Sequence, residues 1–131
     1  MPRAGLLAGG ACLALVACGT GGDPVRDGTP VSYDGVQTRL LDDDLVGFAV
    51  TMSGDATDDD LTLYARCAAA QYALIRGYGF ARHVRTLTEE RGGIRAADAV
   101  YTISAALPRG ERTIDAEVTV AQCDRDGIPT V

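Results

Sequence analysis

The chain has 131 residues, with 18 acidic side chains against 12 basic ones and a net charge of −6. This balance argues against nucleic acid or an anionic lipid surface as the partner of the whole molecule. The length permits one small domain with one core, and only residues 61–112 are locally basic.

Residues 1–17 have the pattern of a secretory signal. Arg3 precedes an apolar, glycine-broken run that is shorter than the roughly 20 residues needed to cross a bilayer. The run ends in Leu15-Val16-Ala17-Cys18, which resembles the lipobox of bacterial lipoproteins. That resemblance implies cleavage before Cys18 and diacylation of its thiol. The alternative is an ordinary signal peptide in which Cys18 has no special role.

Residues 18–35 are rich in Gly, Pro, Asp and Thr, and we expect them to form a flexible tether. Gly19, where some lipoproteins carry an aspartate, is similar to the residue that follows the cysteine in outer-membrane lipoproteins. The expected location is therefore the periplasmic face of the outer membrane, with the inner membrane left open.

The stretch from Thr57 to Phe80 predicts the central helix. Thr57 and Asp60 fit a capping box, and Gly77 supplies a residue that commonly ends a helix. Apolar residues recur at helical spacing over two adjoining stripes, many of them alanines. The stripes comprise Leu61, Tyr64, Ala65, Ala68, Tyr72 and Ile75, and Leu63, Cys67, Ala70 and Leu74. So wide a face of small side chains predicts a helix lying close against a sheet.

Four other segments read as strands because apolar or β-branched residues alternate between turn signals. They are residues 45–53, 80–89, 98–107 and 113–122. The expected fold is a single α+β domain over residues 36–125, of order β-α-β-β-β, with one helix on a mostly antiparallel sheet. Residues 126–131 are expected to form a frayed tail.

Two cysteines remain in the predicted domain, Cys67 on the helix and Cys123 after the last strand. An exported chain meets oxidising conditions, so a disulfide between them is expected, with two separately buried thiols as the alternative. The bond would tie the helix to the last strand. Alternation places Cys123 on the wrong face of that strand, so the pairing requires a bulge near Ala121-Gln122.

A wider pattern joins Tyr33, Val36, Phe48 and Val50 to the helix and its exit Gly77-Tyr78-Gly79-Phe80. This layout resembles a group of small uncharacterised lipoproteins from alphaproteobacteria. The resemblance covers roughly residues 33–85 and implies the same fold and envelope location. It implies no catalytic residue, and Tyr78 and Phe80 are the matching exit positions.

Catalytic signals are weak. His83 is the only histidine, its neighbours Arg82 and Arg85 lower its pKa, and no carboxylate is close in sequence. No motif presents a serine for a catalytic triad, and the acidic runs are explained by turns and a helix cap. We therefore expect no enzyme activity, no cofactor and no metal site.

Arginines of the basic middle segment are the best candidates for recognition, because guanidinium groups pair with carboxylates and phosphates. The alternative is a solvated face. Together with the exit residues, the candidate binding surface comprises Arg76, Tyr78, Phe80, Arg82 and Arg85. The expected function is a lipid-anchored, non-catalytic interaction or structural module of the cell envelope. The alternative is a small binding module for an anionic envelope glycan or lipid.

Overall fold

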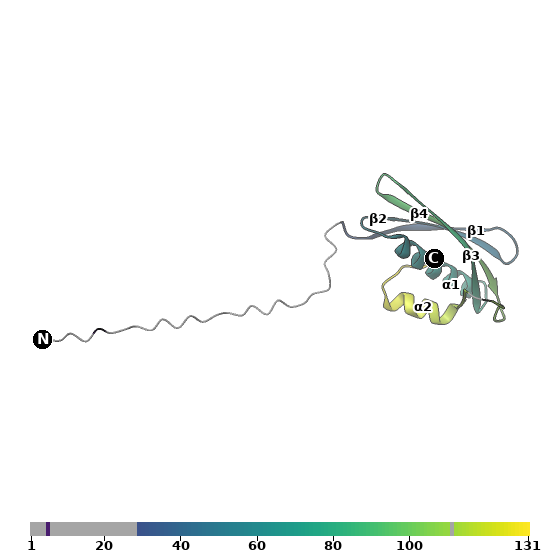
Figure 1. Ribbon diagram of the computed structural model, residues 1–131. Coiled ribbons are helices and arrows are strands. Elements are labelled where there is room, and N and C mark those ends of the chain that lie inside the picture. Colours follow the sequence, from purple (N-terminus) through teal and green to yellow (C-terminus); the bar gives the residue numbers. More distant parts are fainter. Residues whose placement is uncertain (1–4, 6–28, 111) are drawn as a thin grey trace.

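The computed structural model describes Gly5, residues 29–110 and residues 112–131. The elements are β1 Ser32–Leu40, β2 Leu45–Ser53, α1 Asp58–Ile75, β3 Phe80–Arg91, β4 Ile94–Ser104, β5 Thr113–Asp115 and α2 Ala116–Arg125. The strands form one antiparallel sheet in the order β1-β2-β4-β3-β5. Both helices lie on one side of it (Figure 1). The predicted α+β class, with a single small domain, is confirmed, and the observed order is β-β-α-β-β-β-α.

Helix α1 begins as predicted. The amide of Asp60 donates to the Thr57 hydroxyl at 3.2 Å, and the Thr57 amide donates back to the Asp60 carboxylate at 2.8 Å. The helix ends at Ile75, and Gly77 follows with φ of +80°. Both ends of α1 are therefore specified by residues within one turn of them.

The core lies between α1 and the sheet. Phe48 of β2 has no exposed surface, and the alanines of α1 let the helix approach the strands closely. The predicted stripes are only partly confirmed, because Leu63 is 45% exposed and Ile75 is 61% exposed. The fully buried core residues of β2 and α1 are Val46, Phe48, Val50, Met52, Leu61, Ala68, Ala69, Ala70 and Ala73.

Strand β1 was not expected. It begins at Ser32, so residues 32–35, which the composition assigned to the tether, belong to the sheet. The pairing with β2 shifts register between Tyr33 and Gly35, and this irregularity breaks the alternation by which a strand is recognised in sequence. Thr29 also contacts the domain, because its carbonyl accepts from the amide of Asp55 at 3.0 Å.

The prediction of a last strand over residues 113–122 is wrong. Only β5 is extended, and the chain then forms α2. The amide of Val118, in the first turn of α2, donates to the Asp115 carboxylate at 3.0 Å. Alternating apolar residues suggested a strand, yet Val118 is 64% exposed, while Ala116, Thr119 and Cys123 are buried at helical spacing. The helix places Cys123 toward α1 directly, so the expected bulge is not needed.

Cys67 and Cys123 form a disulfide with their Cα atoms 6.0 Å apart. The bond ties α1 to α2 and not to a strand, which corrects the expected connection. The tail beyond α2 is also held in part, because the Ile128 amide donates to the Cys123 carbonyl at 3.0 Å and Ile128 is half-buried.

Gly54 gives a direct test of the contact between the start of the chain and the sheet. It has φ of +75°, and a Cβ atom there would collide with the backbone carbonyl of Pro30. We expect Gly54→Ala to lower the free energy of unfolding by about 1–3 kcal/mol. Gly92→Ala is the matched control, with φ of +59° and nothing within 4 Å of the new methyl group. Equal losses for the two variants in urea unfolding would contradict the contact.

Candidate functional site

Helix α1 covers one face of the sheet, and neither described helix covers the other. We call the face turned away from α1 the open face. On β3, strand pairing places Arg82 opposite Thr102 and Arg85 opposite Val100. Thr102 and Val100 are two residues apart on β4, so they share a face. Arg82 and Arg85 therefore lie side by side on the open face.

A bulge makes this arrangement possible. The pairing of β3 with β4 shifts register between His83 and Arg85, so Val84 has no partner of its own. Without the extra residue, Arg82 and Arg85 would point to opposite faces of the sheet. The bulge also explains why the sequence of β3 alternates poorly.

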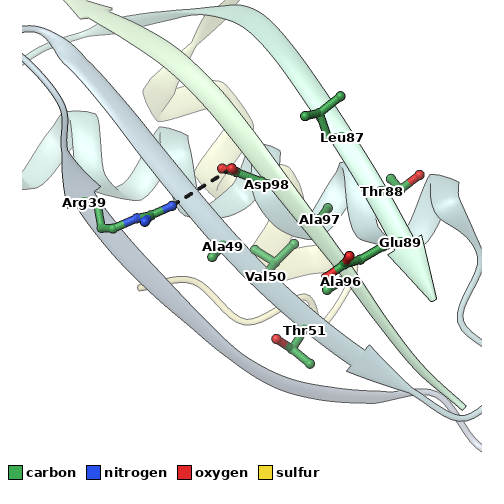
Figure 2. A pocket seen from close by; sticks show the side chains of 10 residues that line it. All are labelled: Arg39, Ala49, Val50, Thr51, Leu87, Thr88, Glu89, Ala96, Ala97 and Asp98. Atoms are coloured by element: carbon green, nitrogen blue, oxygen red, sulfur yellow. Dashed lines mark ion pairs between the residues drawn. The ribbon is translucent and has the colours of Figure 1, made fainter. Parts of the chain in front are cut away.

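A shallow hollow of about 380 Å³ lies in the middle of the open face (Figure 2). Its floor carries the small side chains Ala49, Thr51 and Ala96. Arg39 reaches across it to Asp98, with 4.0 Å between guanidinium nitrogen and carboxylate oxygen. The shape is that of a shallow contact surface.

The five residues of the predicted binding surface do not all lie together in the structure. Phe80 begins β3 and shares the open face with Arg82 and Arg85. Arg76 lies beyond the end of α1, where it donates to the Tyr72 hydroxyl at 2.8 Å and stacks over that ring. Tyr78 packs against the core and is only half-exposed. Three of the five residues thus lie together on the open face, and two do not.

His83 lies on the other face of β3 and is half-buried against Tyr101, with 5.2 Å between the ring centroids. Its Nε2 atom is 2.7 Å from the Thr86 hydroxyl. Burial lowers the pKa of His83, the nearby charge of Arg112 lowers it further, and a hydrogen bond with the Arg85 backbone acts in the opposite direction. This histidine is therefore held toward its neutral form.

A second hollow, which we call the arginine hollow, lies beside His83. It has a volume of about 260 Å³ and opens between α1, β3, β4 and the start of β5. No local motif predicts this hollow, because its residues come from four separate segments of the chain. The lining consists of Thr62, Arg66, His83, Tyr101, Arg112, Thr113 and Ile114.

Tyr101 forms the deep wall of the arginine hollow. Its side chain is only 3% exposed, and burial raises its pKa to about 12, while the charge of Arg66 acts in the opposite direction. Because the pKa in the folded protein exceeds the usual value of 10.0, folding favours the neutral phenol. The stabilisation is complete below pH 10 and is lost as the pH rises toward 12.

We expect the free energy of unfolding to fall by about 2–3 kcal/mol from this group between pH 10 and 12. Denaturant titration at several pH values, compared with Tyr101→Phe, isolates the effect from those of Tyr33 and Tyr64, whose pKa values burial also raises. A pH slope that is the same in the wild type and in Tyr101→Phe would contradict the assignment.

Two remaining predictions concern cysteine and acidic residues. Cys67 is bonded, so it cannot act as a nucleophile in this state. Within residues 29–110 and 112–131, no three His, Cys, Asp or Glu side chains come together as a metal-binding group.

Neither helix in residues 29–110 and 112–131 is long and apolar enough to cross a bilayer. Cys18 lies outside the residues that the structure describes.

The fold and its surfaces define a small α+β domain in which an antiparallel sheet carries a disulfide-linked helix pair on one side. Residues 33–127 match the family described as the YNQ4 C-terminal domain, and the chain belongs to this family.

A protein from Paracoccus denitrificans, described as an uncharacterized 26.9 kDa protein in the nqo8 5′ region, is 32% identical over an alignment of 129 positions. The alignment covers 88% of this chain and 51% of the relative, so the chain spans about half the length of the curated relative that it matches. No solved structure matches. These findings fit the expected group of uncharacterised alphaproteobacterial proteins.

Proposed function

We propose that this protein is a lipid-anchored, non-catalytic interaction module of the bacterial envelope, and that its contact surface is the open face of the sheet. The observation that carries the proposal is the contrast between the two faces. Helix α1 buries one face completely along β2, whereas the open face presents Leu87, which is 62% exposed, and Ile94, which is 50% exposed. Exposed apolar side chains beside arginines are typical of protein contact surfaces.

The disulfide supports an envelope location. Such bonds persist in oxidising compartments, of which the bacterial periplasm is one. The described domain begins near Thr29, so a linker of about ten residues would separate it from a lipid on Cys18. A linker of this size typically spans about 20 Å, so the domain would work close to the membrane surface. We favour the periplasmic face of the outer membrane.

Charge reversal tests the contact surface. The double variant Arg82→Glu and Arg85→Glu should reduce retention of the protein on envelope membranes from its host at least about tenfold, because both side chains point from one face. The control is Arg76→Glu with Arg125→Glu, which makes the same charge change away from the open face. Unchanged retention of the first variant, with native circular dichroism, would refute the proposed surface.

The anchor is tested by the intact mass of the protein extracted from its own membranes. We expect a chain that starts at Cys18 and carries added acyl mass, and we expect Cys18→Ser to leave the membrane fraction. An unmodified chain that begins elsewhere would refute the anchor and leave the contact surface to be judged separately.

The second candidate function is binding of an anionic envelope glycan or lipid. It is favoured by Arg82 and Arg85, which make no ion pair with any acidic side chain in residues 29–110 and 112–131. Retention on protein-free lipid or glycan that is lost in the Arg82 and Arg85 variant would select this candidate over a protein partner.

A further inference from the structure

Two arginines without a side-chain partner among the described residues line the arginine hollow. Arg66 projects from α1 and Arg112 from the segment before β5, and both line the same opening. Neither makes a hydrogen bond through its guanidinium group, or an ion pair, with another residue in the described part of the chain, which does not include Glu111. Among the described residues, no acidic side chain lines the hollow.

Four other arginines of the described residues are engaged. Arg95 is 2.9 Å from Asp58 and 3.3 Å from Glu90, and Arg39 is 4.0 Å from Asp98. Arg76 donates to Tyr72 at 2.8 Å, and Arg125 donates to Gln122 at 2.8 Å. Arg66 and Arg112 have no such partner among the described residues, and both line the same hollow. Each guanidinium group offers a planar fork of N–H donors.

The inner wall supplies a further donor. Tyr101 is 3% exposed, and no hydrogen bond joins its hydroxyl to a described residue. No fully buried side-chain oxygen of the described residues lacks a partner, so this hydroxyl keeps some exposure at the hollow. Thr62, by contrast, already donates its hydroxyl hydrogen to the Asp58 carbonyl at 2.9 Å. His83 lines the hollow, but its Nε2 atom is held by Thr86, so we treat this ring as a neighbour of the site.

We propose that the arginine hollow binds a phosphate group between Arg66 and Arg112, with the Tyr101 hydroxyl as a third donor. Two guanidinium forks from different elements suit a tetrahedral anion, which can accept from several directions, better than a flat carboxylate. At about 260 Å³ the hollow is smaller than the 300–1,000 Å³ typical of sites for organic ligands. It would therefore hold the phosphate while the rest of a ligand lay outside.

Two sources could supply this group, free inorganic phosphate and the phosphate of a lipid headgroup. The hollow lies on the helix side of the sheet, and neither Arg82 nor Arg85 lines it, although Arg82 lines a neighbouring hollow together with His83 and Arg112. The contact surface is tested at Arg82 and Arg85 and the phosphate site at Arg66 and Arg112, so failure of one proposal can be told from failure of the other.

The ring of His83 can report phosphate binding directly, because His83 is the only histidine in the sequence and it lines the hollow. Inorganic phosphate is titrated into the full chain in detergent while the His83 ring protons are followed by NMR, with sodium chloride at equal ionic strength as the reference. We expect a saturable shift with phosphate alone. Arg66→Gln and Arg112→Gln should each weaken binding about tenfold or more, because each removes charge-assisted hydrogen bonds.

Arg125→Gln is the matched control, since it makes the same charge change on α2, where Arg125 already has a partner, and it should leave the binding curve unchanged. A linear or chloride-like response would overturn the proposal. Equal weakening in Arg125→Gln would also overturn it, because it would show a general charge effect. An acidic peptide that displaces phosphate at equal concentration would refute specificity for the phosphate group.

The two sources are separated with vesicles and the Cys18→Ser variant, which cannot bind them through the proposed anchor. Binding to phosphatidylglycerol vesicles that free phosphate competes away, and that Arg66→Gln abolishes, would assign the site to a lipid headgroup. Phosphate binding with no such vesicle binding would assign it to the free ion. Both results support the phosphate site, whereas vesicle binding that is insensitive to Arg66→Gln and to phosphate would count against it.

Discussion

Replacement of both Cys67 and Cys123 by alanine should lower the free energy of unfolding by about 4 kcal/mol. The two residues are 56 positions apart, and the bond between them removes much of the conformational freedom of the unfolded chain. For a domain of this size, the loss is a large part of the total stability. Equilibrium urea unfolding, followed by circular dichroism, measures the effect.

Reductant provides the control. It should destabilise the wild type by a similar amount and leave the double alanine variant unchanged. A wild type that is insensitive to reductant, with thiols that label before unfolding, would contradict the bond. If the helices still pack without it, α2 should be the first element to lose amide protection, because it packs mainly against α1.

Phe48→Ala should cost about 3–5 kcal/mol, the range for removing a large side chain from a core. Phe48 is fully buried on β2, and its ring meets Tyr72 at 5.7 Å and Tyr101 at 6.1 Å in edge-to-face contacts. The variant therefore leaves a cavity and also removes two aromatic contacts. The free energy of unfolding in urea is again the measured quantity.

Leu87→Ala is the matched control, because Leu87 is also an apolar residue of the sheet but is 62% exposed on the open face. Its replacement should change stability by less than about 0.5 kcal/mol. A loss below about 1 kcal/mol for Phe48→Ala, or similar losses for the two variants, would contradict the assignment of the core to the face that α1 covers.

The sequence predicts helix α1 correctly and predicts a strand where α2 forms, and both outcomes have the same cause. The capping box of Thr57 and Asp60 and the helical spacing of α1 are local signals, readable within a few consecutive residues. In α2 the spacing of Ala116, Thr119 and Cys123 was masked by apolar residues that also alternate. The helix then depends on its cap at Asp115 and on packing against α1.

In strand β3, too, the local sequence does not predict how the side chains of the candidate site are arranged. The sequence predicts Arg82 and Arg85 as recognition residues, but their common face depends on the extra residue Val84. Only the pairing with β4 shows that residue as a bulge. Arg66 and Arg112 are further apart in the chain, so no local pattern could bring them together.

Local patterns in the sequence are enough to predict the fold class, the central helix with its ends, the core strands β2 and β4, and the cysteine pair. Each of these rests on short-range periodicity, capping or composition. The tertiary structure decided the first strand, the last helix, the open face and the arginine hollow. These features depend on strand register and on contacts between distant segments, whose energies no single stretch of the chain contains.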